Sequence, residues 1–339
     1  MRKQTLLFIT SLLFTSLFLV SLQKDYATSA TPEYQITKLD RVIAPVYGGI
    51  LLINDTIEIS SVNESTTVDQ VAIGFPVRYE QHLGDIIAYD GNEAKLPVVE
   101  DTGLGAIGYY GATVDFPNSI SLQSGESYTF KVTTLFSNMI ISSARTVNVT
   151  REYVFTAEFP LYPSFSQEVS DYMVRVEIPE NTTYEQVDDV DFNLTESDGQ
   201  QILTHSTESL ESYADNAVKV RFFSDDSDVF TLFAVRSLSR EVTIDARHKI
   251  SVTERYQIAS HNLFTMNSLK LNIPEDAENV SSFDEQGKKL GLDISDDNAG
   301  TIIISFQVVA SQVGGFSVEY GLSDESRHLA LNEGDHRLN

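Results

Sequence analysis

Six asparagines in this sequence stand in the Asn-x-Ser/Thr pattern that can accept an N-linked glycan. A glycan is added only if the chain enters a glycosylating compartment, so the pattern indicates a glycoprotein and does not by itself indicate a glycosylation enzyme. The pattern also arises by chance in a chain rich in Asn, Ser and Thr, so we expect about half of these sites to be used. The candidate residues are Asn54, Asn63, Asn148, Asn181, Asn193 and Asn279.

Two acidic runs carry carboxylates that could bind calcium through oxygen ligands in a loop. Neither run matches a twelve-residue calcium loop, and a solvated acidic loop is the simpler interpretation. A secreted hydrolase would instead need two such carboxylates to converge in one pocket. The residues concerned are Asp188, Asp189 and Asp191 in the first run and Asp293, Asp296 and Asp297 in the second.

Other patterns that mark enzymes are missing from the sequence. There is no cysteine to act as a nucleophile, no G-x-S-x-G, and no H-E-x-x-H among the six histidines. Gly103 to Gly108 fits the letters G-x-G-x-x-G, but a strand-like stretch follows where a dinucleotide site needs a helix. We therefore predict a protein with no catalytic residue, no cofactor and no metal ion.

The composition indicates a folded chain. Of its 339 residues 42% are hydrophobic and 10% aromatic, enough to bury sizeable cores without disulfide bonds. The formal net charge of −26 repels phosphates, which argues against nucleic acid as a partner.

The N-terminus has the features of a secretory signal. Arg2 and Lys3 precede an apolar run over residues 6–22, and small residues lead to Ala30. We expect residues 1–30 to be a signal peptide that is cleaved near Ala30. An uncleaved anchor is the alternative, because seventeen residues of helix reach roughly 25 Å, just short of a hydrocarbon core.

Alternation of apolar and polar residues dominates the rest of the chain, as at Val71, Ile73 and Phe75. Period-two alternation indicates strands buried on one face, and Gly, Pro, Asn and Asp interrupt the runs at regular spacing. These features predict an all-β fold of tandem antiparallel β-sandwich domains. The polar stretch over residues 185–216 is expected to be a surface connection.

The strand pattern of the first hundred residues recurs near the C-terminus, at an offset of about 190 to 200 residues. We expect the first unit to end near Val235 and a second to begin at Arg236, so that the sequence stops halfway through its second unit. The expected segments are 31–145 (β-sandwich), 146–235 (second β-sandwich part of the first unit), 236–325 (β-sandwich repeating the first) and 326–339 (truncated continuation). The expected core equivalences are Ile57 with Val252, Ile73 with Leu271 and Phe130 with Val318.

The stretch over residues 218–322 carries a family resemblance. A strand of the form R-x-hydrophobic-x-hydrophobic precedes a strand that ends in V-x-E, and Phe159 to Pro163 forms an aromatic and proline motif upstream. The matching residues are Arg240, Glu241, Val242, Ile244, Ile250, Val252 and Glu254. This succession resembles the luminal part of ribophorin I, a non-catalytic subunit of the oligosaccharyltransferase complex. His248 and Lys249 stand where that family carries Trp-Gly, which marks a large divergence.

The resemblance implies an accessory subunit in protein N-glycosylation that contacts the catalytic and other subunits and nascent acceptor chains. It implies the luminal side of the endoplasmic reticulum membrane in a eukaryote, or the exterior face of the cell membrane in an archaeon. The family continues with a membrane span, so membrane association is expected through partners, a missing C-terminal span or an uncleaved leader. The alternative is a free-standing cell-surface β-sandwich protein for adhesion or glycan binding.

Overall fold

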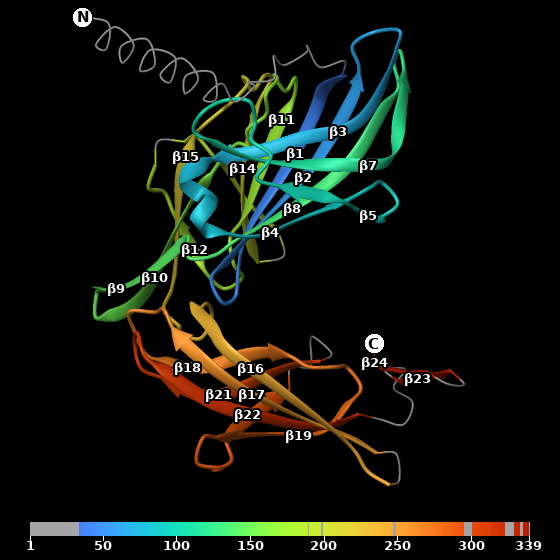
Figure 1. Cartoon of the computed structure of the whole chain (residues 1–339). Coiled ribbons are helices and arrows are strands. Elements are labelled where there is room, and N and C mark those ends of the chain that lie inside the picture. The colour runs from blue at the N-terminus through green and yellow to red at the C-terminus, as the bar shows by residue number, and fades with distance from the viewer. Residues whose placement is uncertain are drawn as a thin grey trace, which may run out of the picture.

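The computed structural model describes residues 34–188, 190–197, 199–246, 249–294 and 300–322, and the backbone of 329–332 and 335–338. The expected signal peptide lies outside these residues. The chain is almost entirely β-structure, arranged as an upper and a lower lobe (Figure 1). Within the described ranges we find one short 3-10 helix, η1 (Val77–His82), and no helix long and apolar enough to cross a membrane.

An eight-stranded sheet forms one layer of the upper lobe. In order across the sheet, its strands are β13 (Asn193–Ser197), β14 (Gln200–Thr207), β11 (Tyr172–Glu177), β1 (Tyr34–Val46), β2 (Ile50–Ser61), β8 (Ser127–Phe136), β4 (Leu83–Tyr89) and β5 (Lys95–Leu96). The apolar alternation of β1 and β2 explains their position, because every second side chain is buried.

Two smaller sheets share a core with the eight-stranded sheet. One contains β3 (Ser65–Pro76), β7 (Tyr109–Gln123) and β6 (Val98–Glu100). The other contains β12 (Thr183–Glu185), β15 (Ala217–Ser224), β10 (Thr150–Pro160) and β9 (Ile140–Val147). Buried residues from all three sheets form one continuous hydrophobic cluster, in which Phe130, Phe155 and Phe222 are fully enclosed.

The expected boundary between residues 145 and 146 does not separate two sandwiches. Strand β11 lies parallel to β1, with Leu39 opposite Tyr172, so the later segment extends the sheet that the earlier segment began. Residues 185–216 also differ from the expected surface connection, because β13 and β14 pair there and bury Leu203. Their polar composition reflects the exposed edge strand β13.

The lower lobe is a separate two-layered unit with its own core. One sheet contains β16 (Phe233–Ile244), β17 (Ile250–Ser260), β22 (Val313–Leu322) and β19 (Ala277–Asp284) in that order. The second contains β18 (Met266–Asn272), β21 (Thr301–Val308) and β20 (Gly291–Ile294). Its buried cluster includes Val252, Leu269 and Val318. A hairpin of β23 (Leu329–Asn332) and β24 (Asp335–Leu338) pairs only with itself among the described strands.

The two units have the same strand connectivity, as the predicted internal repeat requires. The order β1-β2-β8-β4 in the first unit corresponds to β16-β17-β22-β19 in the second, and β3-β7-β6 corresponds to β18-β21-β20. Equivalent strands also change register at equivalent places: Thr37 and Arg236 are bulged residues, and the partner strand carries the extra residues opposite Asp69 and Asn267. Because a bulge sets the local register, these four positions align the two copies residue by residue.

This alignment keeps one expected core equivalence and corrects two. Ile73 and Leu271 are equivalent, as expected, because each lies the same number of residues after the change of register in its strand, at Asp69 and Asn267 respectively. The ladders instead match Ile57 with Tyr256 and Phe130 with Phe316. Strand pairing sets the register between the two copies. In both cases the expected residue lies an even number of positions from the observed one, so it is still on the core-facing side of its strand.

Equivalent turns in the two units share one set of hydrogen bonds. An Asp90 carboxylate oxygen accepts from the amides of Asn92 and Ala94, each at 2.8 Å. The carboxylate of Asp284 accepts in the same way from residues two and four positions later, at 2.9 and 2.8 Å. The two turns therefore have the same structure.

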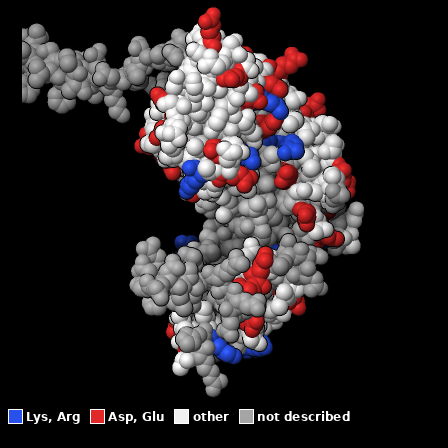
Figure 2. Space-filling view, turned by 90° about the vertical axis from the view of Figure 1, so that its right-hand side faces the viewer, with Lys and Arg blue, Asp and Glu red and all other residues white. Residues whose placement is uncertain are grey.

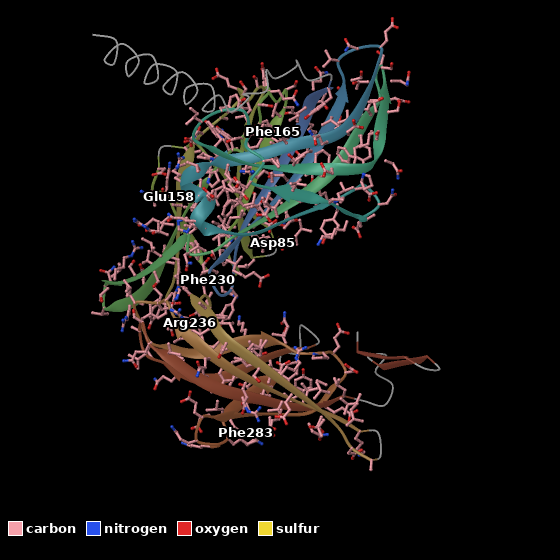
Figure 3. All side chains as sticks on the ribbon, viewed as in Figure 1. Asp85, Glu158, Phe165, Phe230, Arg236 and Phe283 are labelled. Atoms are coloured by element: carbon pink, nitrogen blue, oxygen red, sulfur yellow. The ribbon has the colours of Figure 1, made fainter. Side chains whose placement is uncertain are left out.

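The junction between the lobes contains specific contacts. Phe264, in the loop between β17 and β18, packs against Tyr153 and Phe155 of the first core, with ring centroids 4.6 and 6.0 Å apart. The fully buried Asn262 donates to the Thr231 hydroxyl at 2.6 Å and accepts from the Leu232 amide at 3.0 Å. Figure 3 places Phe230 and Arg236 on either side of this junction, where β16 leaves the upper lobe.

Candidate interaction surface

A buried arginine–carboxylate pair lies between β1 and β2 in the first unit. The Arg41 guanidinium donates to both Asp55 carboxylate oxygens, at 2.7 and 2.8 Å, and its third nitrogen donates to the Pro160 carbonyl at 3.0 Å. Both side chains are at most 5% exposed. Tyr172 of β11 covers the pair and donates its hydroxyl to the Leu161 carbonyl at 2.6 Å.

Burial and pairing act in opposite directions on these groups. Burial lowers the pKa of Arg41, but the charge of Asp55 and its hydrogen bonds outweigh that effect and raise the pKa overall. Burial raises the pKa of Tyr172 well above its ordinary value. The guanidinium therefore stays charged and the phenol neutral, so the pair is a structural tie between two strands.

The second unit repeats the pair at equivalent positions of β16 and β17. Arg240 donates to one carboxylate oxygen of Glu254 from two nitrogens, at 2.7 and 2.6 Å. Two phenols also reach this carboxylate: Tyr320 donates at 3.0 Å, and Tyr256 donates to the other oxygen. Burial followed by the neighbouring carboxylate raises the pKa of Tyr320 to about 12, and burial with the hydrogen bond to Glu254 raises that of Tyr256.

The two pairs differ in what covers them. The side chain of Arg41 is 5% exposed, whereas that of Arg240 is 59% exposed although its partner Glu254 is only 3% exposed. The difference continues along the strand: Leu39 is fully buried in β1, whereas its equivalent Leu238 is 50% exposed in β16. Among the described residues, no strand occupies the position beside β16 that β11 occupies beside β1, and no counterpart of the sheet that contains β10 packs over β16.

We use the term β16 edge for Leu238, Arg240, Val242 and Ile244 and the backbone that carries them. The three apolar members are 50, 40 and 50% exposed, and together they form an apolar row on an edge strand of twelve residues. Exposed edge strands of this length favour pairing with another chain. This edge is therefore the candidate interaction surface.

One pattern in the sequence indicates this surface. The two arginine–carboxylate pairs have the same separation of 14 residues along the chain. Arg240 and Glu254 were singled out only as family-motif residues, and Arg41 and Asp55 were not singled out at all. An Arg and an acid that recur together at equal spacing in both copies would have indicated a cross-strand pair.

The structure places the six candidate glycosylation sites in different surroundings. Asn54 lies within β2, half-buried, and its side-chain oxygen accepts from the Thr133 hydroxyl at 2.7 Å. The other five are exposed, and three of these take a positive φ at turns or a bulge. The exposed five are Asn63, Asn148, Asn181, Asn193 and Asn279.

The acidic runs do not come together as a metal site where the structure describes them. Within the described ranges no three His, Cys, Asp or Glu side chains are placed to hold a metal ion. Asp188 accepts a hydrogen bond from the Lys219 amide at 2.6 Å, and Asp293 is exposed on β20. Asp189, Asp296 and Asp297 lie outside the described residues.

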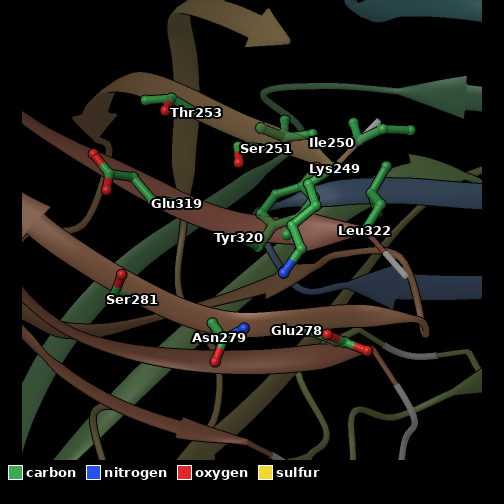
Figure 4. Close-up of a pocket in the computed structure, with 12 residues that line it drawn as sticks. Lys249, Ile250, Ser251, Thr253, Glu278, Asn279, Ser281, Glu319, Tyr320 and Leu322 are labelled. Atoms are coloured by element: carbon green, nitrogen blue, oxygen red, sulfur yellow. The ribbon is translucent and has the colours of Figure 1, made fainter. Parts of the chain in front are cut away.

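A depression of about 420 Å³ on the outer face of β17, β22 and β19 holds two carboxylates, Glu278 and Glu319. Figure 4 shows Glu319 on β22 at one end of the depression and Glu278 on β19 at the other, with Asn279 and Ser281 farther along β19. Two carboxylates that act as acid and base must both reach the reacting bond. This depression therefore lacks the convergent pair that a hydrolase requires.

Acidic residues outnumber basic ones, with 49 Asp and Glu against 23 Lys and Arg. On the face in Figure 2, Asp and Glu are scattered over both lobes, while Lys and Arg form a few small groups. This distribution agrees with the net charge of −26 and offers no extended basic patch on that face for a phosphate backbone.

Comparison with known proteins assigns this chain to no family. No family model and no curated protein matches the sequence. Among solved structures, an M1 zinc metallopeptidase from Deinococcus radiodurans aligns with a TM-score of 0.32 and 13% identity, over 62% of this chain and 44% of that one. A mutant of that peptidase bound to a Tyr-Ser-Ala substrate aligns with a TM-score of 0.32 and 11% identity, over 65% of this chain and 46% of that one. The matched regions span less than half of either peptidase chain.

Proposed function

We propose that this chain is a non-catalytic accessory subunit of an oligosaccharyltransferase, which contacts the catalytic subunit and nascent acceptor chains. The resemblance of residues 218–322 to ribophorin I suggests the complex. Two of the residues that carry the resemblance, Arg240 and Glu254, are the pair at the β16 edge. In this proposal the catalytic groups belong to another polypeptide.

The observation that carries the proposal is the exposed β16 edge. A strand whose equivalent is buried in the first unit here presents apolar side chains and backbone to solvent. Strand addition at such an edge binds a protein partner through main-chain hydrogen bonds and needs no reactive side chain. A scaffold subunit requires this kind of surface.

Affinity purification from native membranes in mild detergent tests this function. We expect a catalytic oligosaccharyltransferase subunit to co-purify, together with other accessory subunits, and to be identified by mass spectrometry. A tagged unrelated β-sandwich protein from the same membranes is the control. Repeated recovery of this chain with no glycosyltransferase subunit would remove the proposal.

A glycan-binding surface protein is the second candidate, favoured by one feature of the second unit. A depression of about 710 Å³ is lined by Phe283 with Arg255, Asp284 and Glu285. An aromatic side chain beside charged groups suits a sugar, which has both apolar faces and hydroxyls. Figure 3 places Phe283 far from the junction between the lobes. Glycan-array binding that Phe283→Ala abolishes would favour this candidate.

A further inference from the structure

The hydrogen-bonding direction of β16 follows from two contacts. The Asp245 amide, directly after β16, donates to the Lys249 carbonyl at 3.0 Å, so odd-numbered amides here point toward β17. Amide directions alternate along a strand, so the amides of Leu238, Arg240 and Val242 point to the open side. The equivalent amide in β1, that of Leu39, donates to the Asp171 carbonyl at the start of β11, at 2.9 Å.

The first unit shows which kind of strand suits this surface. In the parallel pairing of β1 with β11, Leu39 lies opposite Tyr172, Arg41 opposite Val174 and Ile43 opposite Val176. The β1 residues Leu39, Arg41 and Ile43 correspond to Leu238, Arg240 and Val242, which are nearly the same residue types. A strand like β11 would therefore meet similar side chains at the β16 edge, and amides with which no described strand pairs.

We propose that a parallel β-strand from a partner polypeptide pairs with the β16 edge. This strand carries an aromatic residue opposite Leu238 and β-branched apolar residues opposite Arg240 and Val242. The inference rests on the proposed function, because it names how an accessory subunit would hold its partner. The described strands are all placed elsewhere, and β23 and β24 pair with each other.

A second copy of this chain fits the edge less well. Two identical edge strands related by a two-fold axis pair in antiparallel fashion, whereas the first unit shows a parallel partner at this position. The net charge of −26 also opposes close approach of two copies.

The test uses the full chain and a synthetic peptide that corresponds to its own residues 168–178, which contain β11. We expect residue-resolved hydrogen exchange to show new protection of the amides of Leu238, Arg240 and Val242 when the peptide binds. The neighbouring odd-numbered amides already bond to β17 and should change little. A peptide with Tyr172→Ala, or with the same residues in scrambled order, is the control ligand.

Two substitutions of Val242 distinguish loss of the backbone hydrogen bond to the partner strand from a general loss of folded structure. Val242→Pro removes an outward amide without touching the β17 ladder, and edge strands tolerate proline at such positions. We expect Val242→Pro to weaken peptide binding by about tenfold or more. Val242→Ala keeps the amide and should change binding by less than about threefold. Circular dichroism melts of both variants check that the second unit stays folded.

Three results would overturn the inference. The first is equal peptide binding by the wild type and folded Val242→Pro, and the second is no protection at millimolar peptide. The third is protection of the three amides in the full chain before any peptide is added, which would assign the edge to a segment of the same chain.

Purification from native membranes separates this inference from the proposed function. If both wild type and Val242→Pro recover a glycosyltransferase subunit equally, the edge inference fails and the function stands. If the peptide binds as expected but no such subunit is ever recovered, the function fails and the edge inference stands.

Discussion

The two units of this chain have the same strand order but enclose it differently. In the first, β11 and the sheet that contains β10 complete the structure around β1, so that Leu39 is fully buried. In the second, the equivalent strand β16 has a neighbour on one side only within the described residues, and Leu238 is 50% exposed. The comparison shows that a leucine at a core-facing position is buried only when a second layer and a neighbouring strand are present.

Loss of the arginine should show the largest difference between the units. Arg41→Met leaves the Asp55 carboxylate buried without its partner, and we expect the unfolding free energy to fall by about 3–5 kcal/mol. Arg240→Met should cost about 1–2 kcal/mol, because Glu254 keeps hydrogen bonds from Tyr256 and Tyr320. Urea unfolding followed by circular dichroism measures both. As a control, Arg41→Met combined with Asp55→Leu should recover much of the loss. Equal costs for the two arginines would contradict the comparison.

Truncating the equivalent leucines, Leu39 and Leu238, measures what apolar burial alone contributes to stability in each unit. Leu39→Ala creates a cavity in the first core and should lower the unfolding free energy by about 2–5 kcal/mol. Leu238→Ala removes an exposed side chain and should change it by less than about 0.5 kcal/mol. Thermal and urea unfolding of the matched pair measure the contrast. A large cost for Leu238→Ala in the isolated chain would mean that β16 is already covered.

Alkaline pH should weaken the second unit through its phenols. The folded pKa of Tyr320 is raised to about 12, against about 10 when unfolded, because burial and Glu254 disfavour the phenolate. Between these values the unfolded state binds fewer protons, so stability is fully present below pH 10 and falls as pH rises toward 12. Tyr320→Phe should reduce that slope in unfolding experiments between pH 9 and 12. An unchanged slope would show that the phenol does not titrate with folding.

The smallest effect we expect is one that the two units share. Asp90→Ala and Asp284→Ala each remove two hydrogen bonds from a turn of the same geometry. Each should cost about 1 kcal/mol, and the two costs should agree within about 0.5 kcal/mol. Urea unfolding of both variants, with the exposed Lys95→Ala as a nearby surface control, measures this similarity. A clear difference would show that the two turns are not energetically equivalent.

Much of the fold could be predicted from local patterns, but the extent of the sheets could not. Alternation at Val71, Ile73 and Phe75 predicted a strand, and β3 confirms it. The division at residue 145 was wrong because parallel pairing of β1 with β11 joins segments more than a hundred residues apart. Nothing local in either strand specifies that neighbour, since both read as half-buried strands.

The candidate surface was harder to foresee than the fold. Val242 has the apolar spacing of a core residue, and only its 40% exposure reveals an open edge. Asn54 has the same acceptor pattern as Asn63, yet the structure ties Asn54 to Thr133 within a sheet and leaves Asn63 exposed in a turn. Exposure depends on neighbours that are distant in the sequence, so the short motif cannot report it.

By itself the sequence determined the β-strand character, the duplication and the core-facing side of each strand, because side-chain alternation is a local property of the backbone. Only the tertiary structure decided the register between the copies, the joining of two segments into one eight-stranded sheet, and which arginine is covered. These outcomes depend on which distant strand completes each edge. For β1 that strand is β11, and for β16 the described chain supplies none.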